Sequence, residues 1–483
     1  MIRKSKLFRL VGVTCLSAFM LNNAVVAASS PPTPPTLSIS PSPSLPPSAS
    51  SLIAALLSNV QGLEGYTPYL HEPLDQKDML LPPQPLTAKN KSYMLAANAT
   101  TAQWGFFDSN LPPILRINSG DTVIIETHMA SNNQIFPGVT IKQLTELMKV
   151  LPIRGPHTVT GPIYVNGAEP GDILQIKFNK IIPRAYASND NLSGLKGLFP
   201  DDFPKGQLRY FYLDMENKIT EFAPGIVIPL APFPGIVAVA RKDPGKYNTI
   251  PPGPFGGNLD LREMTAGSTL YLPVFMKGAL VWSGDSHGAQ GNGEINLTAL
   301  ETAFKELNVT INVIKTNTPL EWPRVETPTA WIAVGYDADL NKAFEILQME
   351  TIKLIAEKRN VSPDEAEKVM LETWNCPIAE VVNGIDGVYC MIPKDINAPK
   401  PVALLKEDNA DYFASYGKDP DMKKAMSIAA MAMINKVSAQ KKMSRLDVYS
   451  LASLTMDCRI AKPKMGDNEK EVHCTMAKSL WVS

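Results

Sequence analysis

The spacing of apolar residues divides the chain into two regions. In the first region, residues 119–127 (SGDTVIIET) and 170–178 (PGDILQIKF) each follow a Gly-Asp turn and alternate apolar with polar positions. This alternation is typical of half-buried strands, and aspartate suits the turns because its side chain bonds nearby backbone N–H groups. Three later runs have the same character: GSTLYLPVF, GALVWSG and VTINVIKT. The first region therefore predicts a β-sandwich or barrel.

After residue 331 the apolar spacing becomes helical. Residues 337–360 place apolar side chains three or four positions apart, and a second helical stretch follows from Ser362, a good N-cap, and Pro363. Two apolar runs around Asn383-Gly384 then predict a β-hairpin. The order is helix, helix, hairpin.

The same order occurs a second time. Residues 335–343 (GYDADLNKA) resemble residues 417–425 (GKDPDMKKA), 82 positions later. The segments NCPIA and DCRIA keep this offset, and VYCMIPK and VHCTMAK are separated by 84 positions. A nearly constant offset indicates a tandem repeat.

These patterns give a prediction for the whole chain. We expect an α+β, mainly β fold, with a β-rich core over residues 52–330 and helix–helix–hairpin units over residues 331–397 and 398–483. A length of 483 residues, of which 45% are hydrophobic, is ample for such a core.

The N-terminus predicts export. Residues 1–27 combine basic residues, a short apolar stretch and a small-residue cleavage site, as a signal peptide does. Residues 28–51 are rich in proline and serine and predict an extended linker. We expect an exported, periplasmic protein without stable membrane insertion after signal cleavage, because no later stretch is long and apolar enough to span a bilayer.

Charge and motifs exclude several function classes. The formal net charge is −1, whereas nucleic acids and anionic membranes demand a basic face. The sequence has no phosphate-binding Walker loop and no dinucleotide-binding glycine motif after a strand, so we expect no organic cofactor.

Four cysteines remain after signal cleavage, and all lie in the repeated region. Cys376 and Cys390 are equidistant from the predicted turn at Asn383, and Cys458 and Cys474 are equidistant from Gly466. Residues equidistant from a hairpin turn face each other within disulfide reach. We predict the disulfides Cys376–Cys390 and Cys458–Cys474, with reduced cysteines or pairing between repeats as the alternatives.

Candidate chemistry concentrates in residues 284–294 (GDSHGAQGNGE). This stretch contains the G-x-S-x-G pattern of serine hydrolases, with Ser286 as the nucleophile. That hypothesis is weak, because the following residues are rich in glycine and predict no helix. Asp285 and His287, two positions apart on an extended segment, instead point to one side, as metal ligands or proton relays often do.

A second glycine-rich stretch, residues 256–260, adds polar groups. Together with residues 284–294 it flanks a predicted hairpin over residues 268–283, which would bring the two stretches together. Glu294 is the candidate general base for activating water. The alternative for each residue is a turn cap or a satisfied core side chain. The candidate site contains Asn258, Asp260, Asp285, His287 and Glu294.

Longer motifs carry a family resemblance. The segments TGPIYVNGAEPGDIL, PPGPFGGNLDLREMTAGSTLYLPVF, GALVWSGDSHGAQGNGE and MIPK are similar to the acetamidase/formamidase family. The resemblance implies hydrolysis of a short linear amide to a carboxylate and ammonia by an enzyme that forms homo-oligomers. It carries over Asn258, Asp260, Asp285, His287, Gln290 and Glu294 as site positions, and His157 as a binding position.

Two matters stay open in the sequence. A divalent metal, zinc or calcium, could be held by Asp260, Asp285 and His287. Position 292 is asparagine where the family more often has aspartate. A change of this kind can accompany loss of activity, which leaves a second hypothesis of a periplasmic binding or sensory protein on the amidase scaffold.

Overall fold

The computed structural model describes residues 90–149, 155–192, 194–395, 397–398, 404–463 and 468–482. The predicted signal peptide and linker lie outside the described residues. Within the described residues, no helix combines the length and apolar character needed to cross a membrane.

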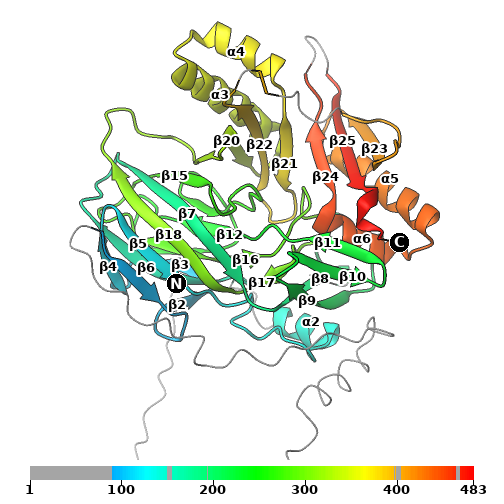
Figure 1. The fold of residues 1–483 in the computed structure, drawn as a ribbon, viewed down its shortest axis with the longest axis horizontal. Helices are drawn as coiled ribbons and strands as arrows, with labels where there is room; N and C mark the ends of the chain where they lie inside the picture. The colour runs from blue at the N-terminus through cyan, green and yellow to red at the C-terminus, as the bar shows by residue number, and fades with distance from the viewer. Residues whose placement is uncertain are drawn as a thin grey trace, which may run out of the picture. The chain divides into compact units, whose positions relative to one another are not determined.

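Two large sheets form the fold (Figure 1). The first has twelve strands, in the order β1 (Ser92–Leu95), β5 (Asp121–Ile125), β18 (Phe304–Ile314), β7 (Ile173–Pro183), β15 (Thr269–Pro273), β19 (Arg324–Glu326), β20 (Ala330–Asp337), β22 (Asp386–Pro393), β21 (Cys376–Glu380), β24 (Asp457–Ile460), β25 (Lys470–Ala477) and β23 (Tyr412–Asp419).

The second sheet has eleven strands. Its main path is β11 (Ile226–Pro229), β10 (Ile219–Ala223), β9 (Gln207–Asp214), β8 (Tyr186–Asn191), β17 (Glu301–Thr302), β16 (Val281–His287), β12 (Phe233–Ala238) and β14 (Gly256–Asn258). A branch from β16 adds β6 (Thr158–Asn166), which pairs with β2 (Ala102–Trp104) and β4 (Leu115–Asn118). A small sheet pairs β13 (Lys246–Asn248) with β3 (Phe106–Asp108). The helices are α2 (Ile141–Lys149), α3 (Leu340–Arg359), α4 (Pro363–Glu372), α5 (Met422–Lys441), α6 (Arg445–Thr455) and the short 3-10 helix η2 (Lys478–Leu480).

One hydrophobic core joins the two sheets. It includes Ile176 and Leu270 from the twelve-stranded sheet and Ile236 and Trp282 from the eleven-stranded sheet, all buried. Burying apolar side chains between two sheets is what stabilises a β-sandwich. The predicted α+β, mainly β fold is confirmed.

The predicted hairpin over residues 268–283 is wrong. Strand β15 pairs with β7 and β19 in the first sheet, whereas β16 pairs with β12, β6 and β17 in the second. The two strands belong to different layers because the residues between them cross from one sheet to the other. Their alternating apolar pattern fitted either arrangement.

The C-terminal region consists of two units with the same element order. Strand β20 is followed by α3, α4, β21 and β22, and strand β23 is followed by α5, α6, β24 and β25 (yellow-green and orange in Figure 1). Each unit thus begins with a strand that the helix–helix–hairpin prediction left out. In the sheet the strands run β20-β22-β21-β24-β25-β23. The second unit therefore has the strand order of the first in reverse, and the units meet at the β21–β24 pair.

Equivalent glycines allow the same packing in both units. A Cβ on Gly335 in β20 would collide with the backbone of α3 at the carbonyl of Ala343. A Cβ on Gly417 in β23 would collide in the same way with the carbonyl of Ala425 in α5. The glycines recur 82 positions apart because both helices cross their strand at contact distance.

Both expected disulfides are present. Cys376 is bonded to Cys390 and Cys458 to Cys474, and in each pair the Cα atoms are 4.1 Å apart. The second pair consists of direct cross-strand partners in the β24–β25 register. Each bridge therefore closes one hairpin, and no bridge joins the two units.

Candidate functional site

Strand β16 carries two of the candidate side chains into a buried centre. The His287 Nε2 atom lies 3.5 Å from Asp285 Oδ1 and 3.4 Å from Oε1 of Glu301, which lies on the neighbouring strand β17. All three residues are at least 94% buried. Asp285 and His287 do point to one side, and Glu301 is a third member that sequence reasoning missed.

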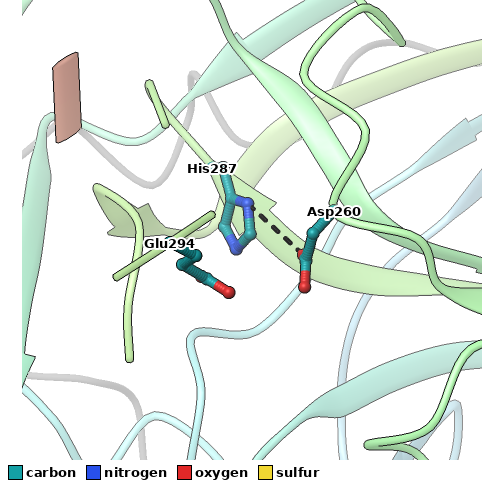
Figure 2. Close-up of side chains that lie close together, drawn as sticks. All are labelled: Asp260, His287 and Glu294. Carbon is teal, nitrogen blue, oxygen red and sulfur yellow. Dashed lines mark ion pairs between the residues drawn. The ribbon is translucent and has the colours of Figure 1, made fainter. Parts of the chain in front are cut away.

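The opposite ring nitrogen of His287 faces another carboxylate, that of Asp260. Its Nδ1 atom lies 3.9 Å from Asp260 Oδ1. Figure 2 shows Asp260 and Glu294 on either side of the His287 ring. His287 is therefore common to two sets of acidic side chains, Asp285 with Glu301 and Asp260 with Glu294.

Strand β12, and not a hairpin, brings the two glycine-rich stretches together. It pairs with β14 on one side and with β16 on the other. Its residue Gly235 lies beneath the cluster: a Cβ there would be 2.6 Å from Asp285 Oδ2 and 2.7 Å from Asp260 Oδ1. The carboxylates can converge because this position has no side chain.

The backbone holds three of the site carboxylates in an uncommon conformation. Asp260, Asp285 and Glu294 have φ angles of 45°, 51° and 50°. The left-handed region is unfavourable for residues other than glycine, asparagine and aspartate, and such positions concentrate at functional sites. The surrounding sheet pairing and loop contacts stabilise these conformations.

The glycine-rich loop before Glu294 lies between the two C-terminal units. Gly291 N donates to the Ser453 carbonyl of α6, and Gly293 N donates to the Ala379 carbonyl of β21. A Cβ on Gly291 would contact the backbone of Ala452 and Met456. Glycine is required here because α6 and β21 both approach the loop closely.

Asn292 has a structural position, away from the cavity. Its Nδ2 donates to the Ile378 carbonyl at 2.6 Å, and its Oδ1 accepts from Cys458 N at 3.1 Å. Only a side chain with both a donor and an acceptor makes this pair of bonds, and an aspartate would place a carboxylate against a carbonyl. The asparagine fastens the loop to both units.

The first hairpin contributes Asn383, which sequence reasoning assigned only to a turn, and Glu380, which it missed. Asn383 donates from Nδ2 to Asp260 Oδ2 at 2.9 Å and lies 3.5 Å from Glu294 Oε2. Glu380, completely buried, accepts from Asn383 N at 3.2 Å. The Asn-Gly signal correctly marked a turn, but nothing local showed where that turn would lie.

The three remaining residues predicted for the site, His157, Asn258 and Gln290, differ in their contacts. His157 lies with Nε2 3.7 Å from Asp285 Oδ1 and Nδ1 3.2 Å from Thr249 Oγ1. Asn258 is buried and its Oδ1 has no hydrogen-bond partner in the described part of the chain. Gln290 donates to the Asp260 carbonyl at 3.4 Å and supports the site from outside the cavity lining.

The serine-nucleophile hypothesis is wrong. Ser286 is 1% exposed, and its Oγ lies 2.7 Å from Thr127 Oγ1 on the side of β16 away from Asp285 and His287. The strand continues through this position to His287 without turning into a helix. A nucleophile elbow would expose the serine at such a turn.

Burial and charge separate the pKa values of the cluster. Burial raises the pKa of Asp260 and of Glu294 well above the ordinary range, and each is raised further by the other acidic groups, Asp285 for Asp260 and Asp260 for Glu294. Burial also acts to raise the pKa of Asp285, but His157 and His287 outweigh it and lower that pKa. Burial opposes the charge of His287, yet Glu301 and Asp285 hold its pKa well above the usual value. Acidic groups with opposite shifts are typical of acid–base sites.

The residues present fit a divalent metal. Ligand atoms of Asp260, His287 and Glu294 lie within 4.8 Å of one another, as do those of Asp285, His287 and Glu301. In the described structure both His287 nitrogens and Asp260 Oδ1 lack hydrogen bonds although they are buried. Two ligands about 2.1 Å from a tetrahedral zinc are about 3.4 Å apart, close to the observed separations of 3.4–3.9 Å. Nitrogen and oxygen ligands suit zinc, whereas calcium prefers oxygen alone.

These groups line one side of a cavity of about 320 Å³. Its polar lining includes His157, Asn258, Asp260, Asp285, Glu294, Glu301 and Asn383. Asp190 also lines it, with a pKa that burial and then Glu301 raise to about 7. The cavity can hold a small polar group against the carboxylates, which separate it from the buried His287.

The fold and site together define a β-sandwich protein with a buried histidine–carboxylate centre. A sequence model of the Acetamidase/Formamidase family matches residues 93–245 and 244–329. The matched region, residues 93–329, belongs to this family. The match covers the region that carries the centre, and both C-terminal units follow it.

Individual proteins agree with this assignment. An acetamidase of Mycolicibacterium smegmatis is 27% identical over 218 residues, covering 33% of this chain and 54% of the relative. A formamidase of Methylophilus methylotrophus is 26% identical over 267 residues, covering 43% of this chain and 62% of the relative. The chain thus spans between one half and two thirds of the length of these curated relatives. The crystal structure of an acetamidase from Yersinia enterocolitica is 26% identical, with a TM-score of 0.57, covering 64% of this chain and 94% of that one.

Proposed function

We propose that the protein hydrolyses the C–N bond of a linear amide, releasing a carboxylate and ammonia at the His287 cluster. The observation that carries this proposal is His287 itself, buried among four carboxylates with no hydrogen bond to either ring nitrogen in the described structure. Family membership and the acetamidase and formamidase relatives give the reaction class.

The reaction assigns a role to each group. A water oxygen attacks the amide carbon while Glu294 takes the proton, with Asp285 as the alternative base. His287 and nearby backbone N–H groups stabilise the negative oxygen that forms. The C–N bond then breaks as the proton passes to the leaving nitrogen, which departs as ammonia. Asn258 orients the amide, since its free Oδ1 faces the cavity.

His287 would hold the metal either with Asp260 and Glu294 or with Asp285 and Glu301, because Asp260 and Asp285, expected to bind it together, face opposite ring nitrogens. When bound, the metal would supply polarisation of the carbonyl or of the attacking water. The carboxylates among these residues would also position the attacking water and the amide in the cavity. Gly235 remains necessary in either case because it lets Asp260 and Asp285 approach each other.

Cell location and assembly belong to the same proposal. Export to a periplasm is supported by the two disulfides, which persist in oxidising compartments. Assembly as a homo-oligomer rests on the family resemblance alone. The hypothesis of an inactive binding protein rested on Asn292, and that residue has a structural role outside the cavity lining.

Ammonia release tests the proposal. The mature chain, assayed with formamide and acetamide, should release ammonia and the matching acid in equal amounts. Glu294→Gln should lower kcat by at least about 100-fold, in line with the loss of a general base. Glu306→Gln is a matched control, because Glu306 is also buried but pairs with Lys180 away from the site. No ammonia from any amide, or full activity in Glu294→Gln, would contradict the proposal.

A further inference from the structure

The cavity has an apolar side that hydrolysis of formamide or acetamide does not use. Six apolar residues belong to its lining: Ala130, Ile135, Met148, Leu192, Ile250 and Leu297; Pro156, Lys196, Asn248 and Thr298 line it as well. Five of the six belong to one small hydrophobic cluster beside helix α2, separate from the core between the two sheets. These five residues form an apolar patch of the lining, here called the wall, beside the polar lining residues.

The cavity is much larger than the amides named for the family. At the roughly 30 Å³ that a water molecule takes up in the liquid, the cavity of about 320 Å³ holds about ten non-hydrogen atoms. Acetamide has four. The volume lies in the range of about 300–1,000 Å³ typical of sites for larger organic ligands.

The arrangement of the lining decides how such a ligand lies. The reacting carbonyl must reach the polar floor, where Asp285 and Glu294 line the cavity. The remainder of the acyl group then meets Leu297, which follows Glu294 by three residues, and the wall formed with Ile135 and Leu192. The side chains of the wall form no hydrogen bond, so a polar or charged acyl group lying against them would lose its hydration there without compensation. Lys196, Asn248 and Thr298 belong to other parts of the lining.

We propose that the preferred substrate is a primary amide whose apolar acyl group contains about four to eight carbon atoms, with the acyl chain buried against the wall of Ile135, Met148, Leu192 and Leu297. This inference rests on the proposed amide hydrolysis and adds the class of acyl group.

A series of straight-chain amides tests the inference. Burying a methylene contributes about 0.8 kcal/mol, or about fourfold in kcat/KM. From acetamide through butanamide to hexanamide, kcat/KM should therefore rise by about fourfold for each methylene that the wall covers. Hydrolysis that is fastest for acetamide would overturn the inference and leave the proposed function intact.

Two neighbouring residues on α2 provide a matched pair of variants. Met148 lines the cavity, whereas Leu147 packs in the same cluster without lining it. Met148→Trp should lower the hexanamide-to-acetamide ratio of kcat/KM at least tenfold, and Leu147→Trp should leave the ratio unchanged. Equal ratios in both variants would overturn the inference.

A binding measurement separates the two proposals. Calorimetry with the Glu294→Gln variant should show tighter binding of hexanamide than of acetamide, whether or not turnover occurs. Tighter hexanamide binding without turnover by the wild-type protein would support the apolar wall and refute amide hydrolysis. Equal binding of the two amides would refute the wall.

Discussion

In the first C-terminal unit the hairpin reaches the site, whereas in the second unit a helix supports the site from behind. Asn383, at the tip of the first hairpin, donates to Asp260. In the second unit it is α6 that contacts the core, where Tyr449 Oη donates to the Ile295 carbonyl at 2.6 Å. Two copies of one topology thus contribute different elements.

Equivalent positions show how far the units have diverged. Glu380 is fully buried beside the site, and its counterpart 82 residues later is the exposed Lys462. Tyr449 is fully buried against the core, and its counterpart 82 residues earlier is the exposed Glu367. The units are related by symmetry to each other, but the core lies on one side only, so equivalent residues meet different surroundings.

The two units should depend equally on their disulfides for stability. Each closes a hairpin loop of similar length, with sequence separations of 14 and 16. Replacing both cysteines of either pair by alanine should lower the free energy of unfolding by about 3 kcal/mol, because the unfolded chain gains loop entropy. Urea unfolding of the two double variants measures this. A large loss for one pair and none for the other would show that the units are not equivalent.

The hairpin tip should matter for activity in the first unit only. Asn383→Ala removes a hydrogen bond to a carboxyl of the site, and a bond of this kind contributes about 1.5–3 kcal/mol. We expect kcat/KM for an amide to fall by about 10- to 150-fold. Glu380→Ala, which frees the Asn383 backbone N–H, should act in the same direction, and Lys462→Ala should not. Activity loss in Lys462→Ala would remove the distinction between the units.

The contact between the units should depend on pH. Lys423 of α5 donates to Asp386 of β22 at 2.8 Å, and burial raises the pKa of Asp386 to about 6 despite this cation. Because the folded pKa lies above the unfolded value near 4, the carboxyl favours the folded state at low pH, and that stability is lost as the pH rises from about 4 to 6. Above this range the buried carboxylate depends on Lys423.

Lys423→Met tests this dependence. At pH 8 the variant leaves a buried charge without its partner and should lose about 1–3 kcal/mol of unfolding free energy. At pH 5 the protonated carboxyl needs the cation less, so the loss should be smaller. Denaturant titrations at pH 8 and pH 5 measure the loss of unfolding free energy, and an equal loss at both pH values would contradict the account.

Removing the Tyr449 hydroxyl of α6 should lower the free energy of unfolding least among these variants. Tyr449→Phe removes the bond to Ile295 and the acceptor for Phe199 N, which lies 3.3 Å from the hydroxyl. We expect a loss of about 1–2 kcal/mol in the free energy of unfolding. Glu367→Ala, at the equivalent exposed position, should stay within about 0.5 kcal/mol of the wild type. A greater loss in Glu367→Ala would reverse the comparison.

Local patterns in the sequence were sufficient for the fold class and for the repeat. Period-two alternation and glycine turns predicted the mainly β core, and the 82-residue offset predicted two units with one disulfide each. Asp285 and His287 were predicted to act together because neighbours two apart on a strand share a face. These features depend on residues close in sequence, or on symmetry between copies.

The rest of the site depends on sheet pairing that no local pattern reveals. Gly235 and Glu301 join the cluster because β12 and β17 flank β16, and Asn383 joins it because the first unit extends the other sheet. A hairpin over residues 268–283 was the simplest local explanation for two adjacent polar stretches, and it placed β15 in the wrong sheet. The family departure at Asn292 suggested lost activity, whereas the side chain bridges the loop to both units.

The central claim is that His287, and not its neighbour Ser286, performs amide hydrolysis on β16. The most direct measurement is the rate of ammonia release by His287→Ala and Ser286→Ala, with circular dichroism to confirm that both are folded. The account predicts a loss of at least about 1,000-fold in kcat/KM for His287→Ala, roughly 4 kcal/mol, and retained turnover for Ser286→Ala. A folded Ser286→Ala protein without activity, or a His287→Ala protein with near wild-type turnover, would contradict it.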